Sequence, residues 1–328
     1  MEGIEERLQV KALTVAPIDG LDAGLEPSNA LGFALSALAC SATAAGIALS
    51  THDALLVWLL GQCILAVALL QWFVLLHEAG HGTLFRSRYL NRAAGHVGGF
   101  FALIPFASWR RIHGLHHLWT GWQDLDPTTA ALAPRSRSRI ECTVVDLAWR
   151  TGLPFFSIVY RLSNYWNAVR FGAIFRAPRQ RAALALNIAV LVAIYGLLLW
   201  SLGVHESLRI AALAVLLSLA LQDPLILSQH THIPQHVSHG ATVRPFPAIE
   251  QEEFSRSLRL PRWLSSLLLH FDAHELHHMY PFVPGYRLNG VPYTPQNEVG
   301  YWDWIRAAKR VPGEVFLFQN RTESGWEI

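Results

Sequence analysis

Four long apolar stretches dominate this chain of 328 residues. They are residues 29–49, 54–76, 182–202 and 208–227. The first three contain no Asp, Glu, Lys or Arg, and the fourth carries only Arg209 and Asp223. Each is close to the length of about 20 apolar residues that a helix needs to cross a bilayer. The sequence therefore predicts an all-α integral membrane protein with four transmembrane helices.

The spacing of these stretches predicts two helical hairpins, because residues 50–53 and 203–207 are short connections. Both termini and the long middle segment then lie on one side of the membrane. Of the 26 arginines and lysines, only Arg209 borders an outer loop. The positive-inside rule assigns the arginine-rich side to the cytoplasm. We therefore expect a multi-pass protein whose termini and active site are cytoplasmic. The 24 arginines against 2 lysines are typical of a GC-rich bacterial genome, so we expect the bacterial inner membrane.

This topology predicts three parts. They are a polar N-terminal segment (1–28), a membrane domain (29–290) and a cytoplasmic C-terminal tail (291–328). Charged residues make up 15% of the chain, against roughly 25% in soluble domains. The net charge is +2 and no basic segment of 5–8 residues is typical of a nucleic-acid-binding patch, so we expect no nucleic-acid partner. The 3 cysteines form neither a disulfide framework nor a zinc motif.

Histidine is abundant, with 16 residues, and half of them fall into three motifs. An HxxxH motif begins at residue 77, and two HxxHH motifs begin at residues 113 and 274. Side chains at i, i+3 and i+4 share one face of a helix, so each motif can present its imidazoles together. We expect a cytoplasmic helical cap in which these residues bind metal: His77, His81, His113, His116, His117, His274, His277 and His278.

A ninth candidate ligand is His230, which follows the last apolar stretch. His232 is the alternative in the same segment, and His270 is a further candidate before the third motif. Structural zinc takes four ligands, and catalytic zinc takes three plus water. Nine imidazoles therefore indicate two metal ions with open positions. Imidazole suits Fe, Cu, Zn and Ni, so the ligands alone do not identify the metal.

Five carboxylates accompany these motifs and could orient the ligands, since metal-bound histidines commonly donate their second N–H to a carboxylate. They are Glu78, Asp124, Asp126, Asp272 and Glu275. For Asp124 and Asp126, which precede Pro127, a structural role in a turn is an equally good interpretation.

Beyond the histidine spacing, longer segments resemble the membrane-bound fatty acid desaturase and hydroxylase superfamily. These segments are HEAGHGTLF, PFASWRRIHGLHH, LSQHTHIPQH and HELHHMYPFVPGYRL. They are most similar to acyl-lipid Δ12/ω-6 desaturases. The resemblance implies four spanning helices and a non-haem di-iron centre on the three histidine boxes, with His230 supported as an additional ligand.

The resemblance also implies an activity and partners. Two iron ions and O2 would remove hydrogen from a fatty acyl chain and introduce a double bond. The substrate would be carried by a lipid, coenzyme A or acyl carrier protein. Electrons would come from a separate ferredoxin, or from cytochrome b5 with its reductase, because no HPGG haem-binding motif is present.

Several alternatives stay open at this point. A hydroxylase, an acetylenase or a carotenoid ketolase would share the same fold and boxes. A metal transporter would place polar ligands near the bilayer midplane, whereas these histidines gather at one edge. A haem protein with two histidine ligands would need histidines within the spans, and none of the four apolar stretches contains one.

Overall fold

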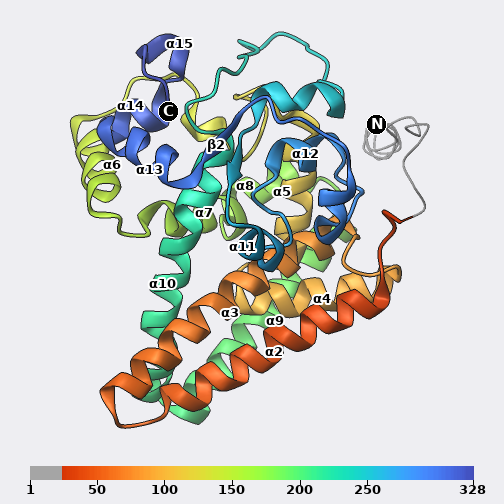
Figure 1. Ribbon diagram of the computed structural model, residues 1–328, viewed down its shortest axis with the longest axis vertical. Coiled ribbons are helices and arrows are strands. Elements are labelled where there is room, and N and C mark those ends of the chain that lie inside the picture. The colour runs from red at the N-terminus through yellow and green to blue at the C-terminus, as the bar shows by residue number, and fades with distance from the viewer. Residues whose placement is uncertain (1–23) are drawn as a thin grey trace. The chain divides into compact units, whose positions relative to one another are not determined.

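The computed structural model describes residues 24–328, which are mostly helical with almost no sheet (Figure 1). The chain forms two compact units. The first, here called the hairpin unit, comprises Pro27–Arg111 and Ser157–Gln222. The second, here called the histidine unit, comprises residues 24–26, Ile112–Phe156 and Asp223–Ile328. The expected division after residues 28 and 290 stays a prediction, and part of its first segment, residues 1–23, lies outside the described residues.

Most of the long helices belong to the hairpin unit. Its own helices are α2 (Asn29–Ser50), α3 (Leu55–His81), α4 (Arg88–Phe101), α8 (Ala168–Ile174) and α9 (Pro178–Leu202). Three further helices continue from one unit into the other: α5 (Phe106–Trp119), α7 (Phe155–Tyr165) and α10 (Val204–His230).

The histidine unit is built from shorter elements. Its helices are η1 (Ala130–Leu132), α6 (Arg139–Thr151), η2 (Ala248–Phe254), α11 (Arg262–Leu267), α12 (His274–Met279), η3 (Gly285–Gly290), α13 (Tyr301–Arg310), α14 (Gly313–Phe318) and α15 (Arg321–Ser324). Strands β1 (Ser257–Arg259) and β2 (Glu298–Gly300) form a parallel pair in which Ser257 lies opposite Glu298.

Four helices in the described part of the chain are long and apolar enough to span a membrane: α2, α3, α9 and α10. They correspond to the four predicted stretches, which confirms the predicted fold class. Several boundaries differ from expectation: α9 begins at Pro178 rather than at residue 182, and α10 begins at Val204 rather than at residue 208. The connection between α9 and α10 is Gly203 alone, whose φ of 77° lies in the left-handed region that glycine tolerates. Helix α10 also continues through Pro224 to His230.

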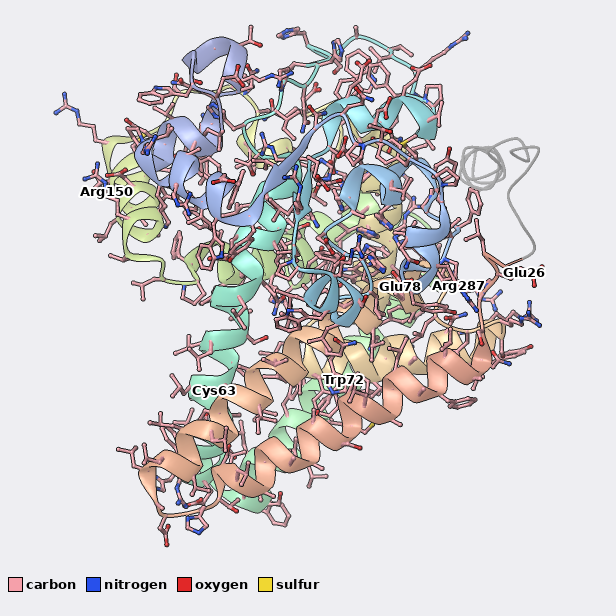
Figure 2. All side chains as sticks on the ribbon, in the orientation of Figure 1. Glu26, Cys63, Trp72, Glu78, Arg150 and Arg287 are labelled. Atoms are coloured by element: carbon pink, nitrogen blue, oxygen red, sulfur yellow. The ribbon has the colours of Figure 1, made fainter. Side chains whose placement is uncertain are left out.

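Close backbone approach holds α2 and α3 together, and Figure 1 shows the two helices side by side. A Cβ atom added to Gly46 on α2 would lie 2.8 Å from the Cβ of Leu65 on α3. Small residues permit such contacts between apolar helices. Trp72, labelled on α3 in Figure 2, donates its indole N–H to Thr43 Oγ1 on α2 at 2.9 Å. Both packing and a buried hydrogen bond therefore stabilise the hairpin.

A buried glutamine on α3 fastens α10 to this hairpin. Gln62 Nε2 donates to Ser50 Oγ on α2 and to the Ile210 carbonyl on α10, both at 2.8 Å. Its Oε1 accepts from the Ala214 backbone N–H at 2.9 Å. Because the N–H and C=O groups of the amide both have partners, Gln62 joins three helices without leaving a buried polar group unsatisfied.

Aromatic packing joins the C-terminal helices to α6 inside the histidine unit. Trp149 of α6 stacks on Phe316 of α14 with ring centroids 4.3 Å apart. Its indole N–H donates to the Ala308 carbonyl of α13 at 3.1 Å. The Lys309 ammonium lies 3.8 Å from the centroid of the same indole, a cation–π contact. The C-terminal segment is thus an ordered part of this unit.

Candidate metal centre

Four imidazoles converge in the histidine unit, and we call them the four-histidine cluster. His116 lies on α5, His230 is the last residue of α10, and His274 and His278 lie on α12. One ring nitrogen from each lies within 4.8 Å of the other three. The Nε2 atom of His274 is 2.8 Å from that of His230 and 3.0 Å from that of His278. The i and i+4 spacing on α12 brings its two rings to one face.

The opposite nitrogen of three of these rings faces an oxygen atom. His116 Nδ1 lies 2.7 Å from Asp126 Oδ2, and His230 Nδ1 lies 2.9 Å from the Phe254 carbonyl oxygen. His278 Nδ1 lies 3.0 Å from Gln251 Oε1. Because these oxygens are acceptors, each ring points an Nδ1–H group at its partner. Burial lowers the pKa of His230 to about 3 and that of His278 well below its usual value. Both of these rings are therefore neutral, and their Nε2 atoms present lone pairs to the centre of the cluster.

This arrangement fits a metal ion. Lone pairs that converge in a buried space repel one another unless a cation lies between them. Hydrogen-bonding of Nδ1 to a carboxylate or carbonyl is also the usual second contact of a metal-binding histidine. Burial, followed by the neighbouring imidazoles, lowers the pKa of His278 well below its usual value. His278 is therefore neutral, which is the form that binds metal.

A second group in the histidine unit consists of His113, His117 and His277, here called the three-histidine group. His117 Nε2 lies 3.1 Å from the Nε2 atoms of both His113 and His277. The His117 ring also stacks on His278, with centroids 4.4 Å apart and planes 27° apart. His117 thus connects the three-histidine group to the four-histidine cluster.

The HxxxH pair occupies the last turn of α3 in the hairpin unit. The ring centroids of His77 and His81 lie 4.8 Å apart, as the i and i+4 spacing predicts. Glu78 Oε1 lies 3.3 Å from His77 Nδ1, and its Oε2 accepts from the Thr83 hydroxyl at 2.9 Å. The Trp109 indole lies edge-on to His77 at 5.7 Å. In Figure 2, Glu78 lies at the end of α3 away from Cys63.

Asp126 combines the two roles that sequence analysis left open. Its Oδ2 contacts His116, and its Oδ1 accepts from the Thr128 backbone N–H at 2.8 Å in a turn. Burial alone would raise the pKa of Asp126, but His116 and the Thr128 hydrogen bond outweigh burial and hold it below its usual value. The carboxylate is therefore ionised and able to orient His116.

The other candidate carboxylates stabilise loops instead. Asp124 accepts from the backbone N–H and hydroxyl of Ser238 at 2.9 and 2.5 Å. Asp272 accepts from the Ser265 hydroxyl at 2.8 Å. Glu275 Oε1 accepts from the backbone N–H groups of Gln296 and Asn297, at 2.9 and 2.7 Å. Of the five carboxylates, Glu78 and Asp126 are the ones that contact a candidate ligand within their own units.

The two alternative histidines lie away from the four-histidine cluster. His232 Nε2 lies 2.8 Å from the Ser324 hydroxyl, near the C-terminus. His270 Nδ1 lies 2.9 Å from the Ser265 hydroxyl. Both have positive φ angles, 61° for His232 and 54° for His270. Their side chains point to other partners, and this supports His230 in preference to His232.

Sequence analysis missed two groups in η2 that contact the cluster. The Gln251 side chain bonds His278, and the Phe254 carbonyl bonds His230. Phe254 acts through its backbone, so its side chain carries no signal of this role. Gln251 follows a stretch without any histidine and belongs to no metal-binding motif. Its burial, with 2% of its surface exposed, is the feature that distinguishes it.

With this geometry in place, comparison with known proteins identifies the family. The family model described as "Fatty acid desaturase" matches residues 53–291, which include all three histidine motifs. The chain belongs to the fatty acid desaturase family. Membership confirms the resemblance noted in the sequence.

Relatives in this family include acyl-lipid desaturases. The chain is 26% identical over 220 residues to the sn-1 oleoyl-lipid 12-desaturase of Picosynechococcus, covering 66% of this chain and 62% of that protein. It is 24% identical over 231 residues to an endoplasmic reticulum omega-3 desaturase of Vigna radiata, covering 66% and 58%. A ferredoxin-type sn-1 acyl-lipid omega-3 desaturase of Synechocystis is 26% identical over 165 residues, covering 48% and 46%. The matches thus cover less than two thirds of each relative.

Proposed function

We propose that this protein is an O2-dependent fatty acyl desaturase with two histidine-bound iron ions. The observation that carries the proposal is the four-histidine cluster, in which buried imidazoles face one point while oxygen atoms hold their Nδ1 protons. Membership of the desaturase family supports desaturation rather than metal transport as the role of this donor set. When bound, the iron ions would activate O2 and permit removal of hydrogen from an unactivated C–H bond.

We assign the ligands as two sets. The four-histidine cluster binds one iron. The other proposed ligands are His77, His81, His113 and His277. His117 completes the nine proposed ligands, and it contacts both His277 and His278.

The protein's own contribution to the reaction is to hold these ligands and to exclude water. Oxygen partners on His116, His230 and His278 fix their tautomers and ring orientations, so that the ligands need little rearrangement when metal binds. The side chains of His274, His277 and His278 are almost fully buried. A dry site protects a reactive oxidant from side reactions.

The proposal extends to partners and location. The substrate would be an acyl chain carried by lipid, coenzyme A or acyl carrier protein, and the acyl-lipid relatives favour lipid. A separate ferredoxin, or cytochrome b5 with its reductase, would supply electrons; the name of the Synechocystis relative includes ferredoxin. The four apolar helices support a multi-pass membrane protein, which we place in a bacterial inner membrane with its site cytoplasmic.

The direct test is expression of the full chain with ferredoxin and ferredoxin reductase in a host with simple lipids. Fatty acids are then profiled by gas chromatography–mass spectrometry. We expect a new double bond with wild-type protein and none with His278→Ala. His205→Ala is the matched control, because 89% of the His205 side-chain surface is exposed, and it should behave as wild type. An added hydroxyl would indicate a hydroxylase, and an unchanged profile with iron-loaded protein would contradict the proposal.

A further inference from the structure

The buried side chain of Gln251 connects elements that carry two different histidine boxes. Its Nε2 donates to the His117 carbonyl at 2.8 Å and to the Phe246 carbonyl at 3.3 Å. Its Oε1 lies 3.0 Å from His278 Nδ1. A reversed amide would place Oε1 against two carbonyl oxygens, so the two carbonyls fix the orientation of the amide.

This fixed orientation determines which nitrogen of His278 is protonated. Because Oε1 can only accept, His278 must donate from Nδ1, and its Nε2 keeps the lone pair that faces His274 Nε2 at 3.0 Å. The same helix, η2, ends at Phe254, whose carbonyl fixes the tautomer of His230 in the same way. Two of the four imidazoles are thus oriented by one short segment.

We propose that Gln251 is a positioning residue of the metal centre, which sets the tautomer of His278 and fixes it relative to the helix that carries His117. It acts through His278 and does not bind metal itself. This inference rests on the metal centre of the proposed function and adds to it a residue outside the histidine boxes. Loss of such a hydrogen-bonding partner typically weakens metal binding by about 10–100-fold.

The test is a Co²⁺ titration of the purified full chain, followed by the visible absorption that reports the Co²⁺ ligand field. We expect Gln251→Leu to weaken Co²⁺ affinity by about 10–100-fold. Gln296→Leu is the matched control, since that exposed side chain donates only to the Thr294 carbonyl, and it should bind as wild type. A Gln251→Leu protein with wild-type affinity would overturn the proposal.

A double-mutant cycle separates positioning of His278 from a general structural effect. If Gln251 acts through His278, adding Gln251→Leu to His278→Ala should change affinity by less than about two-fold. An equally large loss in that background would overturn the positioning role. A wild-type chain that binds no Co²⁺ would contradict the metal centre itself. Equal binding by wild type and Gln251→Leu would contradict only the positioning role of Gln251.

Discussion

The Nδ1 atom of His116 and the Oδ2 atom of Asp126 lie 2.7 Å apart, in side chains that are both almost fully buried. The Thr128 backbone N–H donates to the second oxygen of the same carboxylate. Asp126 is therefore fixed from two directions, and it is the one carboxylate that contacts the four-histidine cluster within the described residues. The other oxygen partners of the four rings are the Thr128 hydroxyl, a backbone carbonyl and an amide.

Replacing this carboxylate should weaken metal binding. Asp126→Asn removes the negative charge that favours an Nδ1–H donor on His116, and such changes cost about 10–100-fold in affinity. The measurement is iron per chain by mass spectrometry after dialysis against a weak chelator. Asp124→Asn is the matched control, because Asp124 bonds Ser238 rather than a histidine. Equal iron retention in the two variants would show that Asp126 does not contribute to metal binding.

Gly80 on α3 leaves space for the Trp109 indole beside the HxxxH pair. A Cβ atom at Gly80 would lie 2.0 Å from Trp109 Cζ3, so Gly80→Ala must displace the indole. Overpacking of this kind costs about 1–3 kcal/mol. Because Trp109 lies against His77 and His81, we also expect lost desaturation. The measurements are thermal unfolding and the fatty acid profile.

A glycine on α9 provides the control for this substitution. Among the described residues, no atom lies within 4 Å of a Cβ placed on Gly196, and alanine has a higher helix propensity than glycine. Gly196→Ala should therefore keep full activity and unfold at the same temperature or higher. If Gly80→Ala behaved like Gly196→Ala, the close packing of Trp109 would not support the HxxxH pair.

Two buried glutamines on α3 should respond oppositely to the same substitution. In the described part of the chain, neither polar atom of the Gln71 side chain has a hydrogen-bond partner. Gln71→Leu removes an unsatisfied amide and should stabilise the protein by roughly 1–3 kcal/mol. Gln62→Leu should destabilise it by a similar amount, because Ile210 and Ala214 lose their partner. Unfolding temperatures in one detergent measure both, and a destabilised Gln71→Leu would contradict this account.

The sequence predicts the long elements of this structure well, because their signals are local. The apolar stretches predicted from hydropathy begin and end within five residues of the ends of α2, α3, α9 and α10. The i, i+3 and i+4 pattern places His113, His116 and His117 together on one helix. Both signals arise from helix geometry, which depends on neighbours in the chain.

The contacts that orient the ligands could not be predicted in this way. Gln251 bonds a backbone carbonyl 134 residues away, and a chain separation of this size leaves no periodic pattern. Asp126 has the same sequence context whether it forms a turn or orients a histidine, and it does both. His270 follows Leu269 in a pair of left-handed residues, and neither residue type indicates that conformation.

Iron content of the purified full chain tests the central claim most directly. After anaerobic loading with Fe²⁺ and removal of excess metal, the account predicts two iron ions per chain in wild type. His278→Ala and His77→Ala should each lower that value, and His205→Ala should not. A wild-type chain that retains no iron, or histidine variants that retain as much as wild type, would contradict the account.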